Sequence, residues 1–142
     1  MTLLFTYGSL KQGFPNAHRN SGQRLPGSYR TREVLPMVLL GEGHVPCVIY
    51  DPGTGYQVMG EVYRMDGPGL VTTDKLERVG EAAGYHRIEI DCERTDLADA
   101  PVVRALVYVR LPAEVPADTP RIGPLREYTS EHAHTFMWTG AD

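Results

Sequence analysis

Short strand-like segments follow one another along the chain with few helices between them, and this order constrains the fold most. Each segment is a run of apolar or alternating residues that ends at a glycine, a proline or a polar turn cluster. Because strands and helices do not alternate regularly, a doubly wound fold is disfavoured. We expect an α+β fold, a small mixed β-barrel or curled sheet with flanking helices. The expected strands are residues 3–7, 29–35, 37–40, 45–50, 57–65, 85–92 and 102–109.

The segments between these strands carry turn, loop and helix signals. Residues 11–28 are rich in Gly, Pro and Asn and are expected to be mostly loop. The turn cluster at residues 51–55 predicts that the strands on either side of it form a hairpin. Asp66 and Pro68 mark a helix start, and the helix is expected to run to about Val79, with Gly80 at its C-terminal end. The proline-containing tail is expected to wrap over the sheet, anchored by Phe136, Met137 and Trp138.

The length and charge of the chain exclude several classes of protein. Its 142 residues and apolar fraction of 42% suit one domain with a single core, spanning residues 1–142. The net charge is -4 and no Lys/Arg block stands out, so we expect no nucleic-acid partner. No apolar run is long enough to span a bilayer, and no basic leader precedes a cleavage site. We therefore expect a cytoplasmic protein without a membrane partner.

The cysteines, histidines and glycines give no pattern typical of a metal or cofactor. Cys47 and Cys92 lie far apart in apolar segments and are expected to be buried thiols. His132 and His134 form an H-x-H pair that is more typical of a solvated tail than of a metal site. A P-loop, a dinucleotide-binding glycine pattern and a G-x-S-x-G nucleophile elbow are all missing from the sequence. We expect no metal and no cofactor.

The segment Tyr7-Gly8-Ser9-Leu10 directly follows the first strand. A glycine there allows backbone N–H groups to converge on one point, and such groups bind anions, including carboxylates. An ordinary strand end is the alternative interpretation of the same four residues.

One carboxylate on the expected helix is a candidate acid–base catalyst. At about 100° per residue, Leu70, Thr73 and Glu77 fall on one helix face. Desolvation beside Leu70 raises a carboxyl pKa toward the value that suits a general base. Asp74 and Arg78 are expected to form an i,i+4 ion pair on the adjacent surface. A solvent-exposed helix glutamate is the alternative interpretation of Glu77.

Several blocks of the sequence, in order, resemble the gamma-glutamyl cyclotransferase-like family. The long middle block is most similar to the gamma-glutamylamine cyclotransferase branch of that family. Thr73 and Leu76 depart from the family pattern, which usually has an apolar residue at the first position and often an aromatic at the second. The packing around Glu77 is therefore in question. The blocks are residues 4–11 and 13–16, residues 35–38 through 52–55 to 60–63, residues 74–77 followed by 85–87, and residues 107–109.

The resemblance implies a small barrel with flanking helices and a small-molecule γ-glutamyl substrate. It implies that Tyr7, Gly8, Ser9 and Leu10 line the substrate site and that Glu77 accepts a proton. The α-amine of the substrate would then attack its own γ-carbonyl, forming 5-oxoproline and releasing an amine. Tyr128, in the poorly matched tail, is predicted to be a substrate-facing aromatic residue.

Two other functions remain open at the level of sequence. One is a γ-glutamyl amidase, in which Glu77 activates water. The other is a non-catalytic module that binds amino-acid conjugates, with Glu77 as a ligand for the ammonium group. Glu61 is a possible second carboxylate, and we expect it to be structural and hydrogen-bonded inside the sheet. The sequence carries no signal for an oligomeric state.

Overall fold

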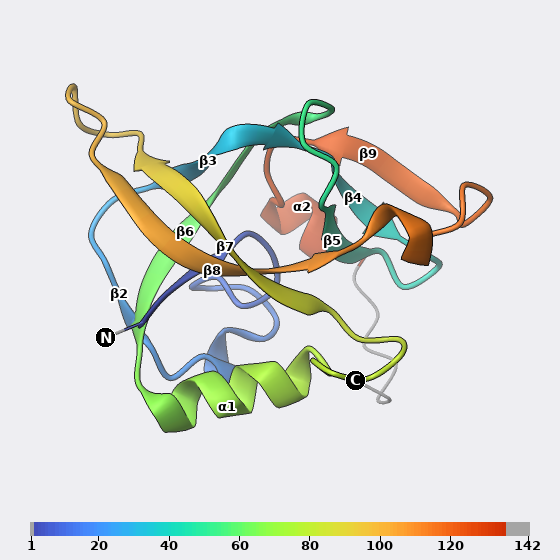
Figure 1. Cartoon of the computed structure of the whole chain (residues 1–142), viewed down its shortest axis with the longest axis horizontal. Coiled ribbons are helices and arrows are strands. Elements are labelled where there is room, and N and C mark those ends of the chain that lie inside the picture. Colours follow the sequence, from blue (N-terminus) through green and yellow to red (C-terminus); the bar gives the residue numbers. More distant parts are fainter. Residues whose placement is uncertain (1, 136–142) are drawn as a thin grey trace.

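Five strands close into a barrel in the computed structural model, which describes residues 2–135 (Figure 1). The barrel order is β1-β6-β3-β7-β8, and β8 returns to β1 through a parallel pairing of Leu4 with Leu106. This arrangement confirms the predicted α+β barrel. The strands are β1 (Thr2–Thr6), β2 (Gln23–Arg24), β3 (Tyr29–Leu35), β4 (Met37–Leu40), β5 (Val45–Ile49), β6 (Tyr56–Met65), β7 (His86–Arg94), β8 (Val102–Arg110) and β9 (Arg121–Leu125). The helices are α1 (Gly67–Leu76) and α2 (Ser130–Ala133), with 3-10 turns at Ala17–Arg19 and Pro112–Glu114.

Strand β8 belongs to both the barrel and a smaller extension of the sheet. Beyond its pairing with β1, it pairs in parallel with β5, with Val48 opposite Val109. Strands β4 and β9 then continue the extension from β5. Strands β1 and β5 thus both run parallel to β8 but separate from each other along its length. Their separation leaves a gap in the hydrogen-bonded ladder beside β8.

The predicted hairpin between residues 45–50 and 57–65 is wrong. Strand β5 pairs with β4 and β8, whereas β6 pairs with β1, β2 and β3. The turn cluster at residues 51–55 does not fold back into a hairpin but crosses the end of β3. There the Gly53 N–H donates to the Val34 carbonyl oxygen at 3.1 Å. Gly55 lies so close to β3 that a Cβ there would be 2.4 Å from the Leu35 carbonyl oxygen. The loop therefore carries the chain from the extension to the barrel.

Helix α1 begins where the sequence predicts and ends earlier. The Asp66 carboxylate accepts the Gly69 N–H at 2.7 Å, as expected of an N-cap. The helix ends at Leu76 instead of about Val79, with Glu77 as its C-cap, because Arg78 adopts a left-handed φ of 57°. Figure 1 shows α1 outside the barrel.

The predicted Asp74–Arg78 ion pair is also wrong. Because the helix ends before Arg78, this residue does not lie one turn beyond Asp74. Its guanidinium pairs with Glu81, and the Asp74 carboxylate pairs with Arg87.

The barrel interior is filled by one cluster of buried apolar side chains. Phe5, Val58, Val62 and Val107 belong to it and come from three different strands. Cys92 joins the same cluster, while Cys47 lies among buried residues of the extension. Both thiols are buried, as predicted, and burial raises the pKa of each to about 12.

The tail differs in part from the expected wrapping segment. It adds β9 to the edge of the extension, and α2 follows. His132 Nδ1 lies 3.0 Å from the Thr129 backbone nitrogen and accepts its N–H at the start of α2. The predicted aromatic anchors Phe136, Met137 and Trp138 lie outside the described residues. Within residues 2–135, no helix combines the length and apolar character needed to span a bilayer.

Candidate active site

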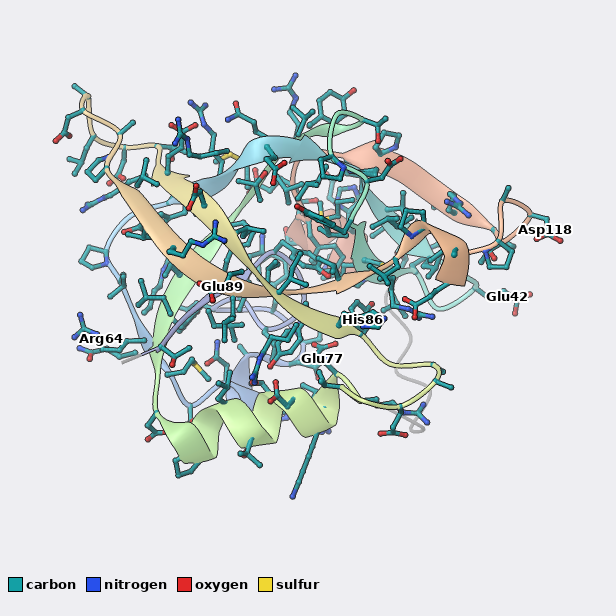
Figure 2. All side chains as sticks on the ribbon, viewed as in Figure 1. Glu42, Arg64, Glu77, His86, Glu89 and Asp118 are labelled. Atoms are coloured by element: carbon teal, nitrogen blue, oxygen red, sulfur yellow. The ribbon has the colours of Figure 1, made fainter. Side chains whose placement is uncertain are left out.

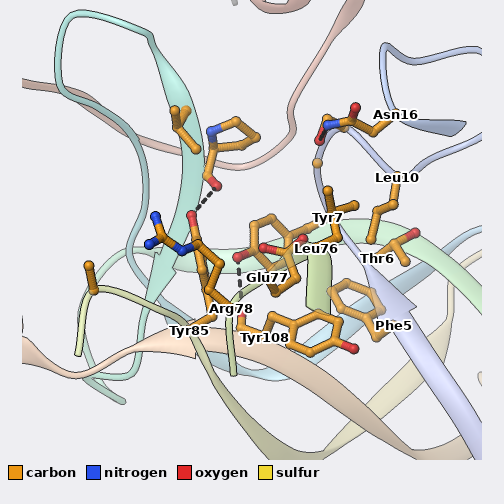
Figure 3. Close-up of a pocket in the computed structure, with 15 residues that line it drawn as sticks. Phe5, Thr6, Tyr7, Leu10, Asn16, Leu76, Glu77, Arg78, Tyr85 and Tyr108 are labelled. Carbon is orange, nitrogen blue, oxygen red and sulfur yellow. Dashed lines mark hydrogen bonds between the residues drawn. The ribbon is translucent and has the colours of Figure 1, made fainter. Parts of the chain in front are cut away.

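A pocket opens where β1 and β5 separate from each other along β8. The end of α1 covers it from outside the barrel, with Glu77 between the helix and the strands (Figures 2 and 3). Its cavity volume is about 100 Å³. The lining consists of residues 5–10, Asn16, Val45, Pro46, residues 76–78, Ala83, Tyr85 and Tyr108.

The Tyr7 hydroxyl bridges the gap between the diverging strands. It donates to the Tyr108 carbonyl oxygen at 2.8 Å and accepts the Val48 N–H at 3.2 Å. These two backbone groups belong to β8 and β5. Where β1 and β5 separate, the Tyr7 hydroxyl supplies the hydrogen bonds that a neighbouring strand would otherwise make with them. Tyr7, which directly follows β1 and lines the pocket, therefore links β8 and β5.

The predicted turn lies on one side of the pocket, and all four of its residues line it. The Lys11 N–H donates to the Gly8 carbonyl oxygen at 3.1 Å, and the Asn16 N–H donates to that of Ser9 at 2.8 Å. Asn16 Nδ2 also donates to Ser9 Oγ at 2.9 Å. A Cβ on Gly8 would lie 2.7 Å from Pro46 Cγ, so close packing against Pro46 requires glycine here.

The structure does not bring Tyr128 into the pocket. Its ring is fully buried in the core, 5.5 Å from the Phe14 ring centroid and 6.0 Å from that of His132. The backbone of Tyr128 contacts the residue directly after the turn, because Lys11 Nζ donates to the Tyr128 carbonyl oxygen at 2.6 Å. Burial lowers the pKa of this lysine. The predicted substrate-facing role of Tyr128 has no support in this geometry.

Glu77 enters the pocket from the end of α1. Its N–H donates to the Thr73 carbonyl oxygen, and its own carbonyl oxygen accepts the Tyr85 N–H, each at 2.9 Å. The backbone of Glu77 is thereby fixed between the last helical turn and the residue before β7. Thr73 is the fully buried member of the predicted helix face, while Glu77 is partly exposed.

Weak acids surround the Glu77 carboxylate. Burial is the main cause that raises the pKa of Tyr7, Tyr85, Tyr108 and Cys47, and the negative charge of Glu77 raises each further. These hydroxyl and thiol groups are therefore neutral at neutral pH. The charged side chains among the described lining residues are those of Glu77 and Arg78.

A polar cluster holds the last turn of α1 against the sheet. The Tyr108 hydroxyl donates to Asp74 Oδ1 at 2.7 Å and lies 2.8 Å from Thr73 Oγ1. The other Asp74 oxygen accepts from Arg87 Nη1, on β7. Because Asp74 lies three residues before Glu77, this cluster determines where the catalytic candidate sits.

Comparison with known proteins supplies the family of the chain. Residues 4–130 match the sequence profile described as gamma-glutamyl cyclotransferase, AIG2-like. The chain belongs to this family. A human gamma-glutamylaminecyclotransferase is 34% identical over 153 aligned residues, which cover 97% of this chain and 96% of the human protein. The Danio rerio gamma-glutamylaminecyclotransferase C is 36% identical over 95 residues, which cover 63% of this chain and 61% of that protein.

A solved structure has the same fold. The crystal structure of an AIG2-like protein from Mus musculus superposes with a TM-score of 0.82 at 27% identity, covering 98% of this chain and 95% of the mouse chain. The family predicted from the sequence blocks is therefore confirmed, together with its barrel fold.

Glu61 lies in a separate polar network of this cyclotransferase-like barrel. Its Oε1 accepts the Gln12 N–H at 2.9 Å and the Tyr63 hydroxyl at 2.8 Å, and its Oε2 lies 3.5 Å from Arg24. This network ties the loop after the turn to β6. The expected structural, hydrogen-bonded role of Glu61 agrees with these contacts.

Several pocket residues were not predicted from the sequence. Tyr85 and Tyr108 stood within blocks that resembled the family and could have been selected on that ground. Pro46 had no local signal, because it reaches the pocket only through the pairing of β5 with β8. Arg78 was assigned to a surface ion pair because the helix was expected to continue through it. Among the described residues, no three His, Cys, Asp or Glu side chains gather as a metal site.

Proposed function

We propose that the protein converts a γ-glutamyl amine or γ-glutamyl amino acid to 5-oxoproline and a free amine. The observation that carries this proposal is the placement of Glu77 in one pocket with the turn at residues 7–10. The family and the name of the human relative support the same reaction class. A cytoplasmic location and a single domain over residues 1–142 remain predictions from the sequence.

In this reaction the α-nitrogen of the substrate attacks the γ-carbonyl carbon. Glu77 first removes a proton from the α-ammonium group, which frees the nitrogen lone pair. The new C–N bond closes a five-membered ring, and the bond from the γ-carbon to the leaving nitrogen then breaks. Two protons move in total from the α-nitrogen to the leaving nitrogen, and one carboxylate can carry them in turn. No enzyme nucleophile or water takes part in bond formation.

The turn has a binding role in this proposal. Backbone N–H groups of residues 8–10 would hold the α-carboxylate of the glutamyl group. That contact would orient the α-amine over the γ-carbonyl, and correct orientation of reacting groups supplies several kcal/mol of the rate enhancement. The neutral phenols around Glu77 would leave its carboxylate as the base of the site.

The test is incubation of the protein with a panel of γ-glutamyl amines and amino acids, scored for 5-oxoproline and free amine. Glu77→Gln is close to isosteric, so we expect an unchanged melting temperature and a loss of turnover of about 10²- to 10⁴-fold. Wild-type turnover by the folded variant would show that Glu77 is not the base. Release of glutamate instead would indicate the amidase, and binding without any product would indicate a binding module.

A further inference from the structure

Lys11 directly follows the turn at residues 7–10, and its ammonium group is buried. The residue is 4% exposed. Its Nζ donates to the Tyr128 carbonyl oxygen at 2.6 Å and lies 4.4 Å from the centroid of the Phe14 ring. These partners are a carbonyl oxygen and an aromatic ring, whereas a buried lysine is usually paired with a carboxylate. The proposed mechanism gives this buried cation no task.

The turn is held through its carbonyl oxygens. The Gly8 carbonyl oxygen accepts the Lys11 N–H at 3.1 Å, and that of Ser9 accepts the Asn16 N–H at 2.8 Å. In the part of the chain that the structure describes, no protein acceptor pairs with the N–H groups of residues 8–10. These N–H groups remain available to a ligand, and their direction depends on how firmly the segment after the turn is held.

The tail offers that segment a fixed support. The Met59 N–H donates to the Arg126 carbonyl oxygen at 2.8 Å, which joins the tail to β6. The Tyr128 ring is fully buried, with its centroid 5.5 Å from that of Phe14. Lys11, Phe14 and Tyr128 therefore pack as one unit between the turn and the tail. The buried Tyr128 hydroxyl has no partner among the described residues, so Tyr128 joins this unit through its ring and its carbonyl oxygen.

Resting on the proposed function, we propose that Lys11 is a positioning residue whose ammonium group fastens the turn at residues 7–10 to the tail. This connection keeps the N–H groups of residues 8–10 converged on one point, where the α-carboxylate of the glutamyl group binds in the proposed function. The tail then contributes to the substrate site without contacting the substrate. Tyr128 takes part through its backbone carbonyl, in place of the substrate-facing role predicted from the sequence.

The test is Lys11→Met, which keeps an unbranched side chain of similar length and removes the ammonium group. The substrate is the γ-glutamyl compound that the wild type turns over fastest. We expect KM to rise and kcat to fall together, with kcat/KM for 5-oxoproline release reduced about tenfold. Lys75→Met makes the same chemical change at an exposed lysine of α1, outside the pocket lining, and should leave the kinetics within about twofold of the wild type.

A second variant acts on the same unit without removing the lysine. Phe14→Leu removes the ring that lies against Nζ, so it should change KM and kcat in the same directions, by about threefold in kcat/KM. Circular dichroism and the melting temperature check that each variant is folded. If Lys11→Met does not fold, Phe14→Leu decides the question, and unchanged kinetics in that folded variant would then overturn the proposal.

Double variants separate positioning of the turn from a general loss of stability. Lys11→Met and Gly8→Ala both act on the turn, so the double variant should lose no more kcat/KM than about the larger of the two single losses. Lys11→Met and Asp74→Asn act on opposite sides of the pocket, so their separate losses should multiply to within about twofold. Losses that multiply in both pairs would overturn the proposal.

Amide NMR spectra give a further measurement that does not depend on turnover. We expect Lys11→Met to shift the amide signals of residues 8–10 and Lys75→Met to leave them in place. Unchanged kinetics in folded Lys11→Met would overturn the proposal, while release of 5-oxoproline by the wild type would leave the proposed function intact. If the wild type releases no 5-oxoproline, the proposed function fails. Shifted amide signals would then show only a structural link, and the positioning role in this reaction fails as well.

Discussion

The two sides of the pocket are held in place by different forces. Residues 5–10 continue a barrel strand that pairs with β6 on one side and β8 on the other. Phe5 and Tyr7 on this side are buried. Residues 76–85 lie outside the barrel, at the end of a helix whose buried residues are Gly69 and Thr73. Backbone hydrogen bonds and the cluster around Asp74 fix that second side.

Because of this difference, substitutions on the two sides of the pocket should affect stability and catalysis to different degrees. The barrel side is part of the hydrophobic core, so changes there alter the free energy of unfolding as well as binding. The helix-end side carries Glu77 on a segment outside the barrel, and Tyr85 is the residue of this segment that packs against the core clusters. A small displacement there moves the Glu77 carboxylate and leaves most of the core intact, and catalysis is sensitive to shifts of about 1 Å.

Among substitutions that leave Glu77 itself unchanged, the largest expected effect comes from Gly84→Ala, on the helix-end side. A Cβ at Gly84 would lie 1.7 Å from the Arg78 carbonyl oxygen, so the loop that holds Glu77 must shift. We expect kcat to fall about 100-fold, with a loss of unfolding free energy of about 1–3 kcal/mol. Steady-state kinetics and chemical denaturation measure the two quantities.

Gly67→Ala is the matched control for this substitution. A Cβ at Gly67 meets nothing within 4 Å, so activity and stability should stay close to those of the wild type. If Gly84→Ala and Gly67→Ala have equal kcat values, the loop does not position Glu77.

Gly8→Ala tests the opposite side of the pocket. Its Cβ would press against the rigid ring of Pro46, so the turn must move away from β5. We expect KM to rise and kcat to fall together, with kcat/KM reduced about tenfold, because in the proposed function the turn both binds and orients the substrate. Unchanged kinetics in a folded variant would remove the turn from the substrate site.

A smaller effect is expected for Asp74→Asn, which keeps the size of the side chain and removes its charge. The contacts with Tyr108 and Arg87 weaken, so we expect kcat to fall about three- to tenfold with KM within about twofold. Asp91→Asn is the control, because Asp91 pairs with Arg104 at 3.1 Å away from the pocket lining. Equal kinetic changes in the two variants would show that the Asp74 cluster has no special link to Glu77.

Tyr7→Phe should have the smallest effect on turnover. It removes the hydroxyl that satisfies one carbonyl of β8 and one N–H of β5. We expect a loss of about 1–3 kcal/mol of unfolding free energy, and kcat within about threefold below the unfolding transition. A large loss of kcat at unchanged stability would instead give this phenol a chemical role.

Sequence reasoning located the elements whose signals are local. The strand at residues 29–35 was predicted with its observed bounds, and the start of α1 followed from the capping residue Asp66. The turn after β1 was placed correctly as well. Strand β2 has two residues, and β9 contains Gly123 and Pro124, which are unfavourable in a strand interior, so neither gave a signal.

The features that were missed depend on contacts between distant segments. The left-handed backbone at Arg78 is uncommon for arginine, so helical periodicity was extended past the true end of α1. The position of β5 beside β8, which brings Pro46 to the pocket, depends on a pairing across about sixty residues. Glu77 lines the pocket and lies one turn after Thr73, as its helix face predicts, but it is the C-cap of α1 and the helix does not continue to Val79.

The origin of the oxygen in the product distinguishes attack by the α-amine of the substrate from attack by water. Wild-type protein and a γ-glutamyl amino acid are incubated in ¹⁸O-water, and the products are separated and examined by mass spectrometry. If the α-amine of the substrate attacks the γ-carbonyl, the carbonyl oxygen is retained. We expect unlabelled 5-oxoproline and free amine in equal amounts. Glutamate carrying one ¹⁸O atom as the first product would contradict it, because water would then be the nucleophile.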